Sequence, residues 1–146
     1  MEEPLVLLNA TQAALRSRFD DFHRAFDHRD EAAYRLALAD FQDWLFRWTE
    51  AEERVLLPAL RRAILPERDP QRELRLEYVQ LRELTRHVRM QIESRGRMAD
   101  LLGLVENLAR RFDAHERENV GVYYPAAAPL LTAAERQSLE DAAHGC

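Results

Sequence analysis

Two stretches of this chain, Phe41–Leu60 and Leu108–Ala127, share a pattern when they are laid over each other at one constant offset. Four positions show the match: Pro58 falls on Pro125, Ala59 on Ala126, Trp48 on His115, and Glu52 on Asn119. Both stretches also place apolar residues at helical spacing. We therefore predict a duplicated helical hairpin, and this repeat limits the fold to two similar helical halves that pack together.

The composition favours one helical domain. The 146 residues are 47% hydrophobic and 32% charged, a balance typical of a globular protein, and only 4 are glycine and 6 are proline. So few helix breakers favour long uninterrupted helices over a fold of many strands. The length allows a single self-sufficient core, so we predict one domain over residues 1–146.

Charge and cysteine usage narrow the partners and the compartment. The net charge is −5 and no basic block is present, so nucleic acid is not a predicted partner. The opening segment MEEPLVLLNA has too short an apolar run for a signal peptide or a membrane span. The only cysteine, Cys146, cannot form an internal disulfide. A cytoplasmic protein without a membrane contact is the prediction.

Apolar periodicity predicts four long helices and a short one. The first covers Leu5–Phe26, and Asp30 is the predicted N-cap of the second, which runs towards Pro58. The third starts after the N-cap Asp69 and stops at Gly96, the fourth runs from about Ala99 towards Pro125, and a capping box of Thr132 and Glu135 starts the last. The predicted fold class is all-α, an up-down-up-down four-helix bundle with a short C-terminal helix.

Distances from the predicted turns place one set of residues at a common level. Trp48 and His115 each lie about nineteen residues beyond their turns, or about 28 Å at 1.5 Å per residue. Counting back the same distance leads to Ala10, Thr11 or Gln12 on the first helix and to Glu77 or Tyr78 on the third. We expect these residues to face one another across the core, where helical bundles build internal sites.

The motif EERVLLP, which runs from Glu52 to Pro58, and its echo before Pro125 resemble the hairpin ends of the hemerythrin-like (HHE cation-binding) domains. The resemblance covers nearly the whole chain. It implies a four-helix bundle with a non-haem di-iron centre that binds or senses oxygen or nitric oxide. The ligands that it implies are a His on the first helix, H-x-x-x-E on the second, a His on the third and H-x-x-x-E on the fourth.

The chain departs from this ligand pattern at most positions. Glu52 and His115 match it, and no His lies in the range Leu5–Leu15 of the first helix. Other residues stand at three ligand places: Trp48 for a His, Tyr78 for a His, and Asn119 for a Glu. Large aromatic rings can fill the core in place of a metal site without loss of the fold. We therefore predict that the di-iron centre has been lost, that no cofactor is bound, and that Glu52 and His115 are a vestigial metal pair.

We therefore predict a non-catalytic site in the core of the bundle. Its six lining residues are Thr11, Trp48, Glu52, Tyr78, His115 and Asn119. A lone core histidine is most simply satisfied by hydrogen bonds to Glu52, Tyr78 or water, and a buried Glu52 would need His115 as a charged partner. Tyr123 and Tyr124 are interpreted as packing residues, with the lining of a pocket mouth as the alternative. The leading function is a binding or regulatory module, with a homodimer and an unknown small-molecule ligand as open possibilities.

Two other functions stay open. The first is a non-haem iron protein that senses or stores metal, oxygen or nitric oxide, with one ion on Glu52, His115 and Glu77 and a Tyr78 phenolate as a further ligand. The second is an enzyme that uses Glu52, His115 and Tyr78 as acid and base groups. It has less support, because acid–base catalysis needs a substrate within hydrogen-bond reach and the sequence indicates no opening.

Overall fold

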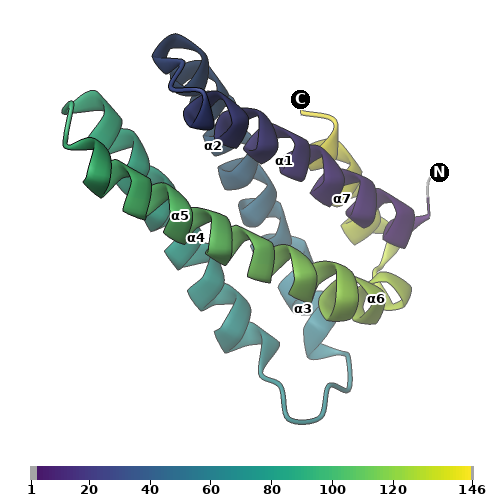
Figure 1. Ribbon diagram of the computed structural model, residues 1–146. Helices are drawn as coiled ribbons and strands as arrows, with labels where there is room; N and C mark the ends of the chain where they lie inside the picture. The colour runs from purple at the N-terminus through teal and green to yellow at the C-terminus, as the bar shows by residue number, and fades with distance from the viewer. Residues whose placement is uncertain (1–2, 146) are drawn as a thin grey trace.

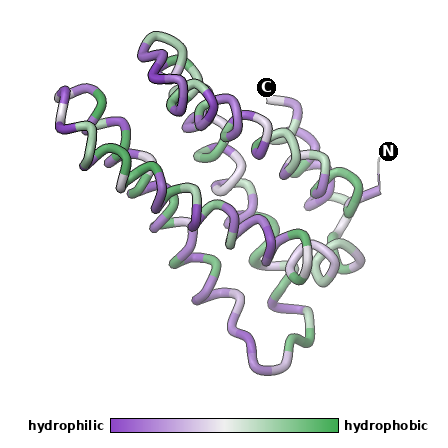
Figure 2. Tube along the Cα trace, in the orientation of Figure 1, coloured by the Kyte–Doolittle hydropathy of each residue, from purple (hydrophilic) through white to green (hydrophobic). Residues whose placement is uncertain are grey.

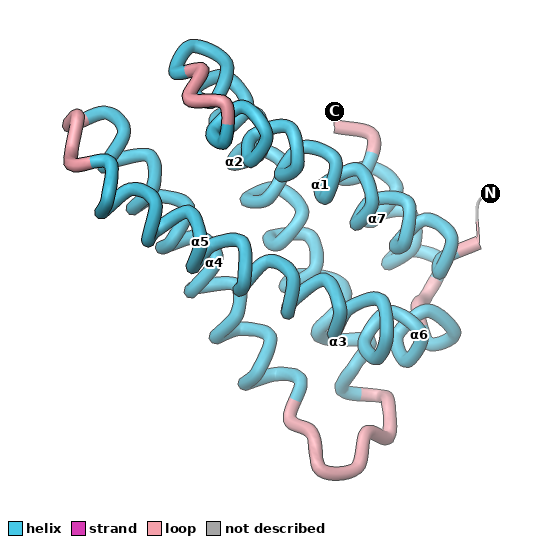
Figure 3. The backbone as a smooth tube through the Cα atoms, viewed as in Figure 1, coloured by secondary structure: helices cyan, strands magenta, loops and turns pink. Residues whose placement is uncertain are grey.

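The computed structural model describes residues 3–145, and nearly all of them are helical (Figures 1 and 3). Four long helices make up most of the molecule: α1 (Pro4–Asp27), α2 (Glu31–Ala51), α4 (Pro70–Glu93) and α5 (Met98–Glu118). No strand occurs among the described residues, so the predicted all-α class is confirmed. Within the same range, none of the helices combines the length and the apolar character that a membrane span requires. Cys146 lies outside the described residues.

The three predicted N-caps, Asp30, Asp69 and Thr132, are the observed ones. The carboxylates of Asp30 and Asp69 each accept a hydrogen bond from the backbone N–H three residues further on, which caps α2 and α4. Thr132 and Glu135 exchange side-chain and backbone hydrogen bonds in a capping box at the start of α7 (Ala133–Ala143). These local interactions satisfy N–H groups that a helix start leaves without an intrahelical partner.

The two tight turns between long helices are built alike. In the turn after α1, Arg29 takes a left-handed conformation with φ 54°, and in the turn after α4, Arg95 does so with φ 55°. Each turn is closed by a backbone bond back to the helix, from Asp30 to Ala25 at 3.1 Å and from Gly96 to Gln91 at 3.0 Å. Gly96 therefore lies in the turn that ends α4, but the left-handed position belongs to Arg95.

The long helices pack as pairs. Helix α1 lies along α2, α4 lies along α5, and α2 also contacts α4, while α7 rests on α1 and α2 (Figure 1). Apolar and polar residues are interspersed along every long helix (Figure 2), and the buried ones recur at the three- to four-residue spacing of an amphipathic helix. Phe19, Phe41 and Phe112 from three helices meet in the core with ring centroids 5.1 to 5.4 Å apart. This cluster joins the first pair of helices to the second.

A π-helical turn follows α2 and another follows α5, at matching places in the repeat. They are η1 (Glu52–Leu56) and η2 (Asn119–Tyr123), and the helices continue beyond them as α3 (Leu57–Arg61) and α6 (Tyr124–Ala127). In each turn, the residue before the proline donates its N–H to the carbonyl five residues back, from Leu57 to Glu52 and from Tyr124 to Asn119. Proline has no N–H to continue an α-helical ladder, and the wide turn lies directly before it. A 3₁₀ turn, η3 (Ala128–Leu130), leads on to α7.

Candidate polar core and the adjoining cavity

A polar cluster lies in the core where the two π turns begin. All six residues predicted to line it are buried, with exposed fractions of 0% for Glu52, Tyr78 and Asn119, 1% for Trp48, 2% for His115 and 6% for Thr11. Glu52 is the first residue of η1, and Asn119 is the first residue of η2. The repeat therefore delivers one polar side chain from each of its copies to the same region of the core.

His115 lies between two carboxylates. Its Nδ1 is 3.0 Å from Glu77 Oε1, and its Nε2 is 3.7 Å from Glu52 Oε2. Burial disfavours the charged ring, but the hydrogen bonds and negative charges of Glu52 and Glu77 outweigh burial and raise the pKa of His115 to about 9. At neutral pH the ring is therefore an imidazolium that compensates buried negative charge.

Glu52 is held mainly by neutral donors. The Tyr124 hydroxyl donates to Glu52 Oε1 at 2.5 Å, and the Asn119 amide nitrogen lies 3.3 Å from the same oxygen. The indole N–H of Trp48 donates in turn to the Tyr124 hydroxyl at 3.1 Å. Burial, followed by the charge of Glu52, raises the pKa of Tyr124 well above its usual value, so this hydroxyl keeps its proton and acts as a donor.

The Asn119 amide is coupled to the protonation of His115. Asn119 Nδ2 lies 3.1 Å from His115 Nε2, a contact that requires a lone pair on the ring nitrogen. The protonated ring needs an acceptor there instead, and Asn119 Oδ1 is a buried atom without another hydrogen-bond partner. A turned amide would present Oδ1 to the protonated ring but would give up the hydrogen bond from Nδ2 to Glu52 Oε1, so the orientation of Asn119 and the protonation of His115 depend on each other.

The first helix contributes Gln12 to the cluster, not Thr11. The Thr11 hydroxyl donates to the Leu7 carbonyl of its own helix at 2.8 Å, so it takes no part in the network. Gln12 Oε1 lies 3.1 Å from the Tyr124 hydroxyl and 3.4 Å from Asn119 Nδ2. The distance from the turn pointed to the neighbourhood of this residue but could not select between adjacent positions.

The sequence predicts Tyr124 to be a packing residue, whereas in the structure its hydroxyl bonds both Trp48 and Glu52. It stands at the place of Leu57 in the repeat, directly before the proline. The exchange of an apolar for a polar side chain at the end of a π turn was the available signal. Tyr78 is brought to the core as predicted, and its ring packs edge-on against His115 at 5.7 Å. Burial, with the charge of Glu52, raises the pKa of Tyr78 well above its usual value.

The donor set does not fit the di-iron centre that the hemerythrin resemblance implies. Two metals held in a bundle need roughly five to seven carboxylate and imidazole ligands. In residues 3–145, no three His, Cys, Asp or Glu side chains are grouped so that they could hold a metal ion. Glu52 and Glu77 face opposite nitrogens of one imidazole ring, so they do not converge on a common point beside it.

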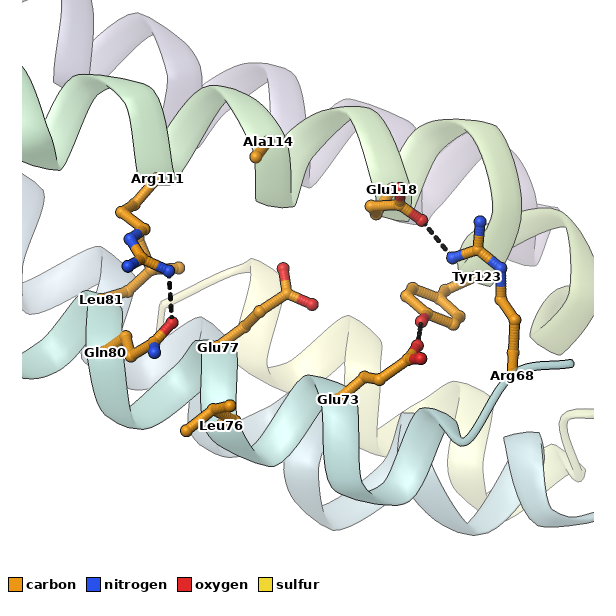
Figure 4. A pocket seen from close by; sticks show the side chains of 10 residues that line it. All are labelled: Arg68, Glu73, Leu76, Glu77, Gln80, Leu81, Arg111, Ala114, Glu118 and Tyr123. Carbon is orange, nitrogen blue, oxygen red and sulfur yellow. Dashed lines mark hydrogen bonds and ion pairs between the residues drawn. The ribbon is translucent and has the colours of Figure 1, made fainter.

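Glu77 connects the polar core to a surface cavity. Its side chain is 27% exposed, and beyond the bond to His115 its carboxylate points into a cavity of about 470 Å³ between α4 and α5 (Figure 4). Tyr123 lines the same cavity and donates to Glu73 at 2.5 Å, and burial with that bond raises the pKa of Tyr123 to about 12. The carboxylate of Glu77 thus links the buried cluster to the cavity.

No protein-family model, no curated protein and no solved structure matches this chain.

Proposed function

We propose that this chain is a hemerythrin-like, up-down-up-down four-helix bundle that has lost its di-iron centre and serves as a non-catalytic binding or regulatory module. The repeat, the paired long helices and the matching turns before Pro58 and Pro125 support the assignment to this fold. The proposal places the module in the cytoplasm, as the cysteine usage predicts. In this proposal, the internal site of the fold has a structural role, and ligand binding takes place at the surface.

One observation carries the loss of the metal centre: residues at former ligand places satisfy the ligands that remain. Asn119 contacts both Glu52 and His115, and Trp48 donates to the Tyr124 hydroxyl, which donates to Glu52. Metal binding would require His115 to lose its proton and Glu52 to give up its hydrogen bonds. The hydrogen-bonded core therefore competes with any metal for the same atoms.

Burial of the cluster supports a role without catalysis. Glu52, Tyr78 and Asn119 have no exposed surface, and His115 has almost none. A general acid or base must come within hydrogen-bond reach of its substrate. Only Glu77 reaches the cavity, and it is tied to His115.

Elemental analysis of protein purified from iron-supplemented cells tests the proposal. We expect iron far below one equivalent per chain, at the same level in the parent and in Glu52→Gln, which keeps the shape of the side chain. The exposed variant Glu83→Gln is the matched control, since Glu83 lies on the surface of α4. Stoichiometric iron that is lost in Glu52→Gln but retained in Glu83→Gln would contradict the proposal.

A second candidate is a single metal ion held by Glu52, His115 and Glu77 with Tyr78. It is favoured by the fact that Glu52 Oε2 and the Tyr78 hydroxyl are buried without a hydrogen-bond partner. The raised pKa of Tyr78 opposes it, because a phenol must lose its proton to bind a metal tightly. After addition of ferric iron, a visible charge-transfer band that disappears in Tyr78→Phe would establish this candidate, and a colourless protein would exclude it.

A further inference from the structure

The cavity between α4 and α5 has the size and the mixed lining of a small-molecule site. Its volume of about 470 Å³ lies within the range of roughly 300–1,000 Å³ typical of ligand pockets. Leu76, Leu81 and Ala114 form apolar parts of its wall, and charged side chains surround them (Figure 4). The cavity can therefore offer both an apolar surface and charged contacts to one ligand.

One end of the cavity is positive. Arg111 lies there and donates to the Gln80 side chain at 2.8 Å. Among residues 3–145, no carboxylate forms an ion pair with its guanidinium, so a neutral amide is its only partner. A guanidinium presents planar paired donors that match a carboxylate. This end therefore suits an anionic group.

The other end and the middle are negative. Two carboxylates, Glu73 and Glu118, stand there against one guanidinium, that of Arg68, which pairs with Glu118 at 2.5 Å. Within the described part of the chain, the side chain of Glu73 accepts a hydrogen bond only from the neutral Tyr123 hydroxyl. Between the two ends, Glu77 extends its carboxylate into the opening (Figure 4).

The charges are spaced along one helix. Gln80, which holds Arg111, lies three residues from Glu77 and seven from Glu73 on α4. At 1.5 Å per residue these separations are about 4.5 Å and about 10 Å. A ligand of either charge alone would supply an opposite charge to one end only, whereas a molecule with both charges a few carbons apart supplies one to each end.

We propose that the cavity between α4 and α5 binds a small zwitterion, an ammonium and a carboxylate joined by a short aliphatic chain. The carboxylate pairs with Arg111, the ammonium binds Glu77 and Glu73, and the chain lies on Leu76 and Leu81. This inference rests on the proposed binding function and gives its ligand a chemical class. The bond between Glu77 and His115 makes the core sensitive to occupancy, because an ammonium beside Glu77 lowers the pKa of His115.

Titration calorimetry with three probes of equal chain length tests the ligand class. The probes are ε-aminocaproate, which carries both charges, hexylamine, which carries only the cation, and caproate, which carries only the anion. We expect ε-aminocaproate to bind at least about tenfold more tightly than either half-ligand, since each charged hydrogen bond contributes roughly a factor of ten or more. Failure of ε-aminocaproate to bind, or equal binding of a half-ligand, would overturn the proposal.

Four variants locate the site. Glu77→Gln retains an acceptor for His115 and Arg111→Gln removes an exposed charge, so each should weaken ε-aminocaproate binding at least about tenfold. The matched controls are Glu83→Gln on α4 and Arg110→Gln beside Arg111, both outside the cavity lining, and they should bind like the parent. Unchanged binding in Arg111→Gln would overturn the proposal even if Glu77→Gln failed to fold.

The two proposals fail separately. Iron content reports on the polar core, and probe binding reports on the cavity, so both are measured on the same preparation. Iron-free protein that binds no zwitterion would refute the ligand class alone. Protein that contains stoichiometric iron would refute the loss of the metal centre, whatever the probes show.

Discussion

The two copies of the repeat have the same backbone arrangement, but their buried polar side chains are complementary. In both, a long helix widens into a π turn directly before a proline. The first copy presents Trp48 and Glu52, a neutral donor and a carboxylate, and the second presents His115 and Asn119, a cation and an amide. Each copy alone would bury polar groups without partners, and together they form one network. The comparison indicates that two segments with the same backbone arrangement can carry complementary side chains.

The largest effect should come from the charged member of the first copy. Glu52→Ala leaves the His115 cation and the Tyr124 hydroxyl in the core without their carboxylate, and we expect a loss of about 3–5 kcal/mol in the free energy of unfolding. Urea denaturation followed by circular dichroism measures it. Glu53→Ala, at the next and partly exposed position, is the control and should cost far less. A loss below about 1 kcal/mol for Glu52→Ala would show that the carboxylate is not needed to balance the core.

Part of this comparison could be predicted from the sequence, and part could not. Helical periodicity and distance from the turns placed Trp48, Glu52, Tyr78 and His115 in one buried layer, because these quantities depend only on the regular rise and rotation of a helix. Spacing predicts Thr11 as the lining residue of the first helix although Gln12 reaches the network, since adjacent residues differ by about 100° around the axis. That rotation is fixed by packing, which the pattern of one helix does not contain.

Tyr124 shows a second limit. It follows a π turn, whose extra residue changes the direction of every later side chain relative to an α-helix. Pro125 indicates that the helix is disturbed near this position, but the sequence does not indicate that the disturbance is a π turn. The π turns, and with them the donor that binds Glu52 most closely, therefore lay beyond what spacing could predict.

The cation of the second copy, His115, should make the stability of the fold depend on pH. The pKa of His115 is about 9 in the folded chain, compared with 6.5 for a free side chain. Because the folded pKa is raised, the stability it contributes is fully present below about pH 6.5 and is lost as pH rises through about 9. The difference between the two pKa values corresponds to about 3 kcal/mol of stability at most. Urea unfolding at a series of pH values should show this decline.

Two variants sharpen the pH result. Glu77→Gln removes one of the two carboxylates that raise the pKa of His115, so the decline should shift to lower pH and become smaller. His87→Gln changes an exposed histidine on α4 and should leave the decline intact. A parent protein equally stable at pH 6 and pH 9.5 would mean that folding does not raise the pKa of His115.

A smaller effect is expected where the copies differ at the end of the π turn. Tyr124→Phe removes a hydroxyl that serves both Trp48 and Glu52, and we expect a loss of about 1–3 kcal/mol, because two buried polar groups lose a partner. Leu57, the matching residue of the first copy, carries no polar group, so Leu57→Met is a control that mainly tests packing. Trp48 fluorescence should shift in Tyr124→Phe but not in Leu57→Met. A variant as stable as the parent with unchanged fluorescence would remove Tyr124 from the network.

The smallest change in stability is expected at the two turns in which an arginine takes a left-handed conformation. Glycine adopts this conformation without a steric penalty, so Arg95→Gly should stabilise the fold by about 0.5–1 kcal/mol. Arg29→Gly should gain less or lose stability, because the Arg29 guanidinium donates to the Phe26 carbonyl at 2.7 Å and lies over the Phe26 ring at 4.7 Å. Thermal unfolding of both variants measures the difference. If the two substitutions gave equal shifts, the contacts of Arg29 would contribute nothing, and the two turns would be equivalent in energy as well as in backbone shape.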